Sequence, residues 1–242
     1  MRGLTSVAGD ARILLHLLKG RSRHADHAAS LEAFYAPQAA DYDAFRARLL
    51  HGREEMIARL SIGAGMRVVE LGCGTGSSLQ IMGPQVATLA QFDMVDLCES
   101  LLKVARERAA GQGNIVVHQA DATRWRPAQP VDRVFISYAL TMIPGWRQVI
   151  ANAAAMLKPG GRIGVVDFHQ PAGGMLNGFW RRWFAHDGVF LDAGHLMALR
   201  DNFPDGWFAE RRAALPYLPF IKAPYYLFVG GCGTRQAAEQ AE

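Results

Sequence analysis

A stretch near residue 70 constrains the fold of this chain more than any other. Val68 to Leu71 form a short apolar run interrupted by Glu70, and glycines follow at positions 72, 74 and 76. An apolar run that ends in glycines is typical of a buried parallel strand entering a tight turn. Glycines permit positive φ and let a ligand approach the main chain, and a helix beginning near Ser77 would aim free N–H groups at that ligand. The sequence therefore predicts a nucleotide-like cofactor site at this turn.

Strand-like and helix-like segments alternate through the central chain. We expect strands at residues 67–71, 88–95, 114–119, 131–138 and 162–168, and helices at residues 79–82, 99–110 and 146–157. A Lys-Pro-Gly-Gly turn at residues 158–161 ends the last helix. This alternation predicts an α/β fold with a doubly wound, mostly parallel sheet. Ligands of such sheets bind outside the carboxyl ends of the strands.

The pattern changes after residue 170. An aromatic and basic segment at residues 173–188 precedes a helix at about 193–202 and two late strands at 208–215 and 225–230, with prolines between the strands. Such a pair most simply forms an antiparallel edge. We therefore expect three regions along the chain. They are an N-terminal helical extension or lid (1–60), a core (61–233) with an insertion at about 171–205, and a polar tail (234–242).

Composition limits the class of protein. The chain has 242 residues, half of them hydrophobic, which suffices for one substantial core. Its three cysteines have no metal-like spacing, so we expect a reducing, cytoplasmic setting without disulfides or a metal site. No apolar run is long enough to span a bilayer, and no signal peptide is evident. The net charge of +4 suits an anionic surface or substrate. We expect no nucleic-acid partner, and an oligomer is possible.

The glycine spacing favours one cofactor class over another. Dinucleotide sites use G-x-G-x-x-G, but Ser77 stands where the third glycine is required, and Gly76 comes one position early. Glu70 would also place a carboxylate beside a pyrophosphate, which is unfavourable. A carboxylate is acceptable beside a sulfonium cofactor, which has no phosphate and carries an ammonium group. The turn therefore favours a sulfonium cofactor.

Residues 69–76, Val-Glu-Leu-Gly-Cys-Gly-Thr-Gly, resemble the first motif of class I S-adenosylmethionine-dependent methyltransferases. The resemblance covers about residues 60–170 and implies a Rossmann-like sheet of seven strands with S-adenosylmethionine as cofactor. It implies that Asp96 holds the ribose, that Asp121 and Ala122 read the adenine, and that Ser137 and Tyr138 lie at the methyl-transfer face. The full set of expected cofactor residues is Tyr42, Glu70, Gly72, Cys73, Gly74, Gly76, Asp96, Leu97, Asp121, Ala122 and Ser137.

Flanking segments suggest the acceptor. Residues 34–46, 50–54, 179–188 and 216–226 resemble betaine-lipid methyltransferases, which convert diacylglyceryl-homoserine to diacylglyceryl-N,N,N-trimethylhomoserine by three N-methylations. The resemblance implies a lipid amine substrate. Two alternatives stay open, a phosphatidylethanolamine N-methyltransferase and a methyltransferase for a soluble or quinone-type small molecule.

An ammonium acceptor must lose a proton before it attacks a methyl group. Candidate bases near the strand ends are Tyr138, His51, Asp167 and His169, although each residue type also has common structural roles. A quaternary ammonium product favours aromatic faces. The acceptor carboxylate needs a cation, such as Arg181, Arg182 or one of the basic residues crowded at positions 46–53. The expected substrate-binding residues are Tyr35, Trp180, Arg181 and Arg182, and Tyr35 could alternatively cover the cofactor.

Two segments suggest contact with a membrane surface. Residues 10–19 read as a short amphipathic helix, capped by Asp10 and ended by Gly20, with arginines directly after it. Such a helix packs on its own domain or a second subunit, or lies on anionic headgroups. The Trp-Arg-Arg-Trp segment at 180–183 suits packing, headgroup binding or an interfacial position. We therefore expect a peripheral membrane protein.

Overall fold

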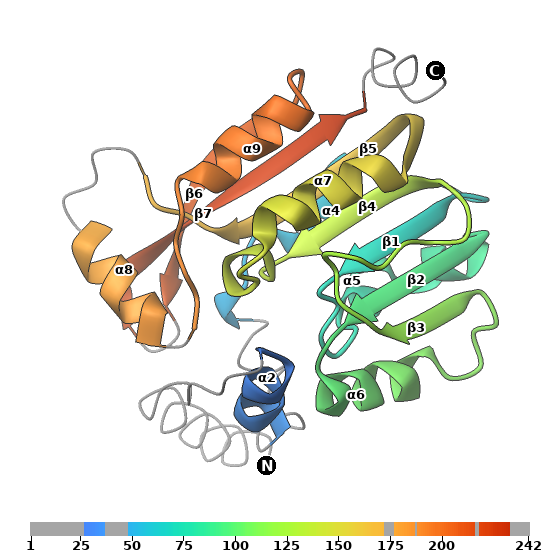
Figure 1. Ribbon diagram of the computed structural model, residues 1–242, viewed down its shortest axis with the longest axis horizontal. Coiled ribbons are helices and arrows are strands. Elements are labelled where there is room, and N and C mark those ends of the chain that lie inside the picture. Colours follow the sequence, from blue (N-terminus) through green and yellow to red (C-terminus); the bar gives the residue numbers. More distant parts are fainter. Residues whose placement is uncertain (1–26, 37–47, 172–176, 187, 216–217, 233–242) are drawn as a thin grey trace.

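The computed structural model describes residues 27–36, 48–171, 177–186, 188–215 and 218–232. A seven-stranded sheet in the order β3-β2-β1-β4-β5-β7-β6 forms the centre, with helices on both faces (Figure 1). The strands are β1 (Arg67–Leu71), β2 (Gln91–Asp96), β3 (Ile115–Gln119), β4 (Val131–Ser137), β5 (Leu157–Phe168), β6 (Trp207–Leu215) and β7 (Leu218–Gly231). This confirms the predicted doubly wound α/β fold.

The sheet consists of a parallel part and an antiparallel edge. Strands β1 to β5 pair in parallel, as their continuous apolar character predicts. Strand β7 lies antiparallel between β5 and β6. Its direction means that the beginning of β7 lies at the edge where the parallel strands end.

Two helical layers bury the two faces of the sheet. One face carries α4 (Arg53–Arg59), α5 (Ser78–Met82), the 3₁₀ segment η2 (Gly83–Thr88) and α6 (Glu99–Ala109). The other carries α7 (Trp146–Met156) and α9 (Gly194–Asn202), while the short η3 (Leu140–Met142) follows β4. Each layer closes over its own cluster of buried side chains, one including Phe92 and Leu102 and the other Ile150 and Phe203. Two further helices, α2 (His27–Tyr35) and α8 (Asn177–His186), lie outside these layers.

Three predicted boundaries were wrong. Strand β2 begins at Gln91 because residues 83–88, which start with Gly-Pro, form η2. Strand β5 includes the Lys-Pro-Gly-Gly segment, although Gly160 has a φ of 76° and the pairing with β4 shifts between Val131 and Arg133.

The third correction concerns β7, which begins at residue 218 and therefore contains prolines 219 and 224. The carbonyl of Pro224 accepts the His169 N–H at 3.0 Å, on the side facing away from β6. Because the N and O atoms of one strand residue point to the same side, the missing N–H costs no bond to β6.

Some sequence predictions lie outside the described residues. They are the helix at 10–19, Tyr42 and the tail at 234–242. Within the described part of the chain, no helix is long and apolar enough to cross a membrane.

Candidate functional site

The glycine turn joins β1 to α5 and is held by the neighbouring strand. The N–H groups of Gly72 and Cys73 donate to the Val95 carbonyl at 2.8 and 3.1 Å. Gly72 has a φ of 75°, and a Cβ there would lie 2.3 Å from the Cβ of Ala139 in the loop after β4. The turn therefore requires glycine at position 72 for both its backbone conformation and its close contact with a second loop.

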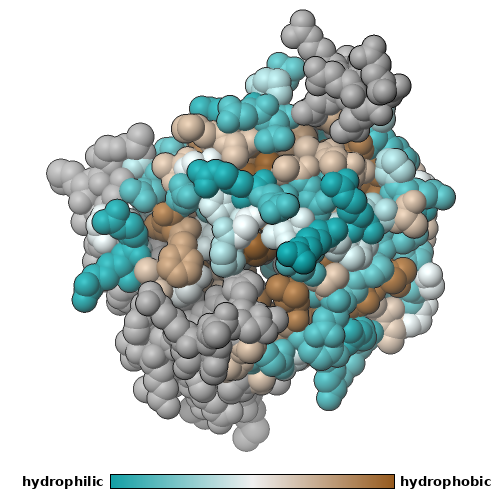
Figure 2. Space-filling model, in the orientation of Figure 1, coloured by the Kyte–Doolittle hydropathy of each residue, from teal (hydrophilic) through white to brown (hydrophobic). Residues whose placement is uncertain are grey.

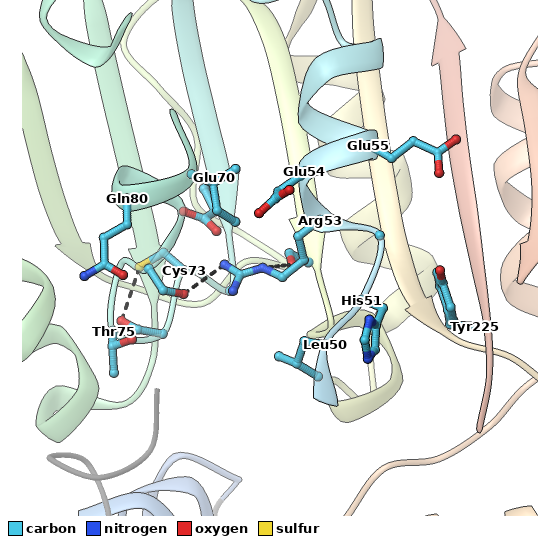
Figure 3. A pocket seen from close by; sticks show the side chains of 16 residues that line it. Leu50, His51, Arg53, Glu54, Glu55, Glu70, Cys73, Thr75, Gln80 and Tyr225 are labelled. Carbon is cyan, nitrogen blue, oxygen red and sulfur yellow. Dashed lines mark hydrogen bonds between the residues drawn. The ribbon is translucent and has the colours of Figure 1, made fainter. Parts of the chain in front are cut away.

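Two cavities meet at this turn and share Gly72 and Gly74. We call the first the apolar cavity, of about 350 Å³. Its lining residues are Leu31, Tyr35, Gly72, Gly74, Asp96, Leu97, Leu101, Ala120, Asp121, Ala122, Thr123, Tyr138, Ala139, Met142, Ile143, Pro144 and Gly145. We call the second the charged cavity, of about 590 Å³ (Figure 3). Its lining residues are Leu50, His51, Gly52, Arg53, Glu54, Glu55, Glu70, Gly72, Cys73, Gly74, Thr75, Ser77, Gln80, Ile81, Ser137 and Tyr225.

Two oriented carboxylates stand in the apolar cavity. Asp96, at the end of β2, accepts the Gly74 N–H at 2.8 Å on one oxygen and the Cys98 N–H at 2.9 Å on the other. Asp121, after β3, accepts both the N–H and the hydroxyl of Thr123 at 2.8 Å. A carboxylate oxygen can accept more than one hydrogen bond. The cavity can therefore bind hydroxyl and amino groups on an otherwise apolar ligand.

Helix α2 covers the apolar cavity. Its Tyr35 is buried and donates its hydroxyl to the Met142 sulfur at 3.3 Å. Glu32 accepts the Ser100 N–H at 3.2 Å, the Ser100 hydroxyl and the Cys98 thiol at the start of α6. Although burial opposes the effect, these hydrogen bonds lower the pKa of Glu32. The N-terminal extension is thus joined to the core by a charged contact beside the cavity.

Arg53 and Glu70 line the end of the charged cavity next to the glycine turn, which we call its inner end. The Arg53 guanidinium extends across it toward the glycine turn (Figure 3) and donates to the Ser137 hydroxyl at 3.0 Å and the Ser77 hydroxyl at 2.9 Å. Glu70 is buried and accepts the Ser78 hydroxyl. Burial raises the pKa of Glu70 to about 7, against the opposing effects of the Ser78 bond and the Arg53 charge. This end can therefore bind a carboxylate and an ammonium group.

The outer wall of the charged cavity combines an aromatic face with both signs of charge. The rings of His51 and Tyr225 lie 6.5 Å apart between centroids (Figure 3). Arg211 pairs across the strands with Tyr225, and its Nη2 lies 3.7 Å from Glu55 Oε1. Burial raises the pKa of Tyr225, as does the Glu55 charge, while the Arg211 charge lowers it. The wall therefore presents acidic side chains and an aromatic ring, with the Arg211 cation next to Glu55 beside the cavity.

The four predicted bases lie in different surroundings. Tyr138 lines the apolar cavity with a φ of 53°, and its hydroxyl donates to the His51 carbonyl at 2.7 Å. Burial raises the pKa of Asp167 to about 6, but its oxygens accept from Thr141 and from the Phe168 N–H. His169 pairs with Glu210 at 2.8 Å. Of these four, His51 is the one that lines the charged cavity.

The predicted cofactor residues gather around the turn. Glu70, Cys73 and Ser137 line the charged cavity, Leu97 and Ala122 line the apolar one with the two aspartates, and Gly76 shapes the turn beneath them with a φ of 71°.

The predicted substrate residues are dispersed. Tyr35 lies in the apolar cavity with the expected cofactor residues. Trp180 is buried in α8, Arg181 and Arg182 are exposed there, and none of the three lines either cavity.

Sequence reasoning missed several cavity residues. Arg53 stood out only as one of a basic group, and Glu54, Glu55 and Tyr225 were not singled out, nor was Arg211, which contacts Glu55 beside the cavity. Only folding brings Arg53 to Ser137, which is 84 positions away. Among the described residues, no group of His, Cys, Asp and Glu could hold a metal ion.

Residues 68–161 match the family model for a methyltransferase domain. In sequence, the chain is 28% identical over 142 residues to the ubiquinone/menaquinone biosynthesis C-methyltransferase UbiE of Pseudomonas entomophila. That alignment covers 57% of this chain and 54% of the relative, so the chain spans about half the length of the curated relatives it matches.

Solved structures show the same fold at low sequence identity. The N-methyltransferase NodS of Bradyrhizobium japonicum, in complex with S-adenosylhomocysteine, is 17% identical with a TM-score of 0.64, over 84% of this chain and 98% of NodS. A phosphoethanolamine N-methyltransferase of Haemonchus contortus in complex with S-adenosylmethionine is 15% identical with a TM-score of 0.66, over 84% of this chain and 60% of that one. The fold is that of class I methyltransferases.

Proposed function

We infer from the methyltransferase domain at residues 68–161 and the similar methyltransferases that this chain is an S-adenosylmethionine-dependent methyltransferase. We further propose that it is an N-methyltransferase whose acceptor is the amine of diacylglyceryl-homoserine. Three transfers would then give the betaine lipid diacylglyceryl-N,N,N-trimethylhomoserine.

The two cavities fit the two ends of the cofactor. In the apolar cavity, Asp96 would hold the ribose hydroxyls and Asp121 the adenine amino group. In the charged cavity, Glu70 would meet the ammonium and Arg53 the carboxylate of the methionyl end. When bound, the cofactor supplies an electrophilic methyl group on its sulfonium sulfur. The residues of the chain would bind the cofactor at both ends, with Gly72 and Gly74 of the turn shared by the two cavities.

The outer wall of the charged cavity carries the acceptor assignment. A homoserine headgroup presents an ammonium and a carboxylate on one carbon. Glu55 would attract the ammonium and Arg211 the carboxylate, while the Tyr225 ring would face the quaternary ammonium that results. The Glu55–Arg211 pair is partly exposed, and such pairs are weak, so a charged ligand can replace either partner. The position of this pair beside the cofactor cavity is the observation that carries the proposal.

His51 is suited to removing the acceptor proton. Its ring lines the charged cavity beside Tyr225, whereas Asp167 and His169 are engaged with other groups. A neutral imidazole can take a proton from an ammonium that Glu54 and Glu55 have drawn into the cavity. Replacement of His51 by Gln would then lower kcat.

A quinone-type acceptor is the second candidate, since the sequence relatives are quinone C-methyltransferases. Such an acceptor carries no ammonium for the glutamates of the outer wall. A phosphatidylethanolamine acceptor would bring an ammonium with a phosphate, which Arg211 could also bind. The acceptor therefore has to be assayed directly.

The test presents vesicles containing diacylglyceryl-homoserine together with labelled S-adenosylmethionine and resolves the products by mass. We expect mono-, di- and trimethylated lipid. Absence of transfer to this lipid, with binding of the cofactor confirmed, would refute the acceptor assignment. Transfer to phosphatidylethanolamine or to a quinone precursor instead would reassign it.

Substitution of Arg211 makes the same test specific to the outer wall. Arg211→Gln should raise KM for diacylglyceryl-homoserine about three- to tenfold, because a charged hydrogen bond is lost at a partly exposed site. The exposed Arg200 on α9 lines neither cavity, and Arg200→Gln is the matched control. Equal KM values for the two variants would argue against a carboxylate site at Arg211.

A further inference from the structure

The β6–β7 hairpin extends past the rest of the sheet. Pairing between β5 and β7 ends at Phe168 and Tyr225, whereas β6 and β7 stay paired as far as Leu215 and Leu218. We call residues 211–215 and 218–224 the ribbon. The pairing is regular from Arg211 and Tyr225 to Ala214 and Lys222, about 10 Å of strand, and shifts in register before Leu215 and Leu218. Because β7 is antiparallel, the ribbon projects from the edge where the parallel strands end, which is also the edge of the two cavities.

The ribbon is joined directly to the charged cavity. Tyr225 directly follows the ribbon in β7 and lines that cavity. Its cross-strand partner, Arg211, is the first residue of the ribbon in β6. A surface that contacts Lys222 therefore lies about 10 Å along the strand from Tyr225.

The ribbon is aromatic and basic. Arg212 pairs with Pro224, and Ala214 pairs with Lys222, so these side chains share a face. Phe220, two residues before Lys222 in β7, lies where the pairing with β6 becomes irregular and is 94% exposed. Arg212 and Lys222 are also exposed. Farther along the same face, α9 covers Phe228 through Phe203, so the ribbon is the part of this face that extends beyond the helical layer.

The ribbon itself carries no acidic residue. No Asp or Glu occurs between Arg211 and Gly231. The nearest acid on the same face, Glu210, pairs with His169. Helix α8 adds two exposed cations, Arg181 and Arg182. Figure 2 shows hydrophobic and hydrophilic residues next to one another on this part of the surface. An exposed aromatic ring flanked by cations is complementary to an anionic lipid interface.

We propose that the ribbon docks the protein on an anionic membrane, with Phe220 entering the interface and Arg212 and Lys222 contacting the headgroups. The proposal rests on the proposed function, because docking there would present a membrane-resident acceptor to the outer wall of the charged cavity. It assigns membrane contact to the β6–β7 hairpin, for which the sequence had predicted no membrane contact.

The experiment measures co-sedimentation of the full chain with vesicles of phosphatidylcholine and phosphatidylglycerol, without acceptor lipid or cofactor. We expect binding that weakens with salt and is lost on pure phosphatidylcholine. Phe220→Ala should weaken partitioning about tenfold. Arg212→Gln and Lys222→Gln should each weaken it about fivefold. Wild-type protein that fails to bind the anionic vesicles would overturn the proposal.

Matched controls separate the ribbon from general surface effects. Met197 on α9 is 68% exposed, and Lys103 on α6 is exposed, so Met197→Ala and Lys103→Gln remove an exposed apolar and a basic side chain elsewhere. Both should bind vesicles as wild type does, and every variant should retain its affinity for S-adenosylhomocysteine. Equal losses in the controls, or self-association that depends on Phe220 without vesicle binding, would contradict membrane docking.

The outcomes also separate this proposal from the acceptor assignment. Vesicle binding through the ribbon without methyl transfer to diacylglyceryl-homoserine would support docking and refute the acceptor. Methyl transfer to a soluble short-chain homoserine acceptor without vesicle binding would refute docking alone.

Discussion

The apolar and charged cavities share the glycine turn but are built in different ways. The apolar cavity takes its carboxylates from the ends of adjacent strands, where the backbone of the next few residues orients Asp96 and Asp121. The charged cavity draws Arg53 from α4 and Tyr225 from β7, which lie far apart in the sequence. The first is therefore a local property of the β-α units, and the second depends on the assembly of the whole fold.

This difference in construction distinguishes the proposed cofactor site from the proposed acceptor site. A strand-end carboxylate can be placed from sequence because parallel strands end at a common edge. The outer wall of the charged cavity includes residues of the last strands. Its side chains can change without altering the edge at which the parallel strands end. We therefore expect variants at the turn and the apolar cavity to affect every ligand, and variants at the outer wall to affect the acceptor alone.

Substitution of the shared turn should give the largest effect. Gly72→Ala combines a left-handed backbone with a Cβ contact of 2.3 Å to Ala139, so the free energy of unfolding should fall by roughly 2–5 kcal/mol and cofactor binding should be lost. Gly74→Ala meets only Leu101, at 3.9 Å, and should lose about 1–2 kcal/mol. Urea denaturation and calorimetric titration measure both. Equal losses would show that the loop after β4 does not constrain the turn.

Removal of the ribose carboxylate should come next. Asp96→Asn cannot accept the two backbone N–H groups as the carboxylate does, and affinity for S-adenosylhomocysteine should fall about 10- to 100-fold. Asp132 lies at the opposite edge of the sheet, where it binds the Arg67 N–H and Lys158, so Asp132→Asn should leave the affinity unchanged. Unchanged affinity in Asp96→Asn would mean that the apolar cavity does not hold the ribose.

The apolar cavity could be predicted from the sequence to a greater extent than the charged cavity. Asp96, Asp121 and the glycine turn line the two cavities, and their positions follow from strand ends and local turn geometry, which the sequence predicts. Tyr35 was expected either at the acceptor or over the cofactor, and it lies in the apolar cavity; the packing of α2 on α6 that puts it there was not evident from the sequence.

Long-range contacts account for what could not be predicted. Asp167 lies near the end of β5 as a candidate base should, yet its oxygens accept hydrogen bonds from Thr141 and from the Phe168 N–H. The Glu55–Arg211 pair joins residues that only the completed sheet brings together. The early start of β7 was hidden by its prolines, and with it the ribbon.

A pH titration of cofactor binding tests the role of Glu70 in the charged cavity. Its pKa in the folded protein, about 7, lies above the ordinary value of 4.5, so Glu70 is mainly protonated at pH 6. An ammonium ligand favours the ionised form, so affinity should rise roughly tenfold from about pH 6 to pH 8.

Glu70→Gln should abolish that part of the pH dependence. The raised pKa also means that the stability contributed by protonated Glu70 is complete below about pH 4.5 and is lost as the pH rises through 7. The stability of wild type relative to Glu70→Gln should therefore fall across this interval. The same pH dependence of affinity in both proteins would place the ammonium elsewhere.

The smallest effect is expected at α2, which we propose to act as a lid over the apolar cavity. Glu32→Gln weakens the contacts to Ser100 and Cys98 and should reduce affinity for S-adenosylhomocysteine about two- to fivefold. Glu107 on α6 makes a matched control as Glu107→Gln, since it is exposed and lines neither cavity. A loss as large as that of Asp96→Asn would show that α2 is part of the binding site itself.

The most direct test of a cofactor divided between two cavities is a titration of two ligands into two variants. S-Adenosylhomocysteine has both ends of the cofactor, whereas methylthioadenosine lacks the amino-acid end. The account predicts that Asp96→Asn weakens both ligands, while Arg53→Ala weakens S-adenosylhomocysteine at least tenfold and leaves methylthioadenosine nearly unchanged. Equal losses of both ligands in Arg53→Ala would contradict it.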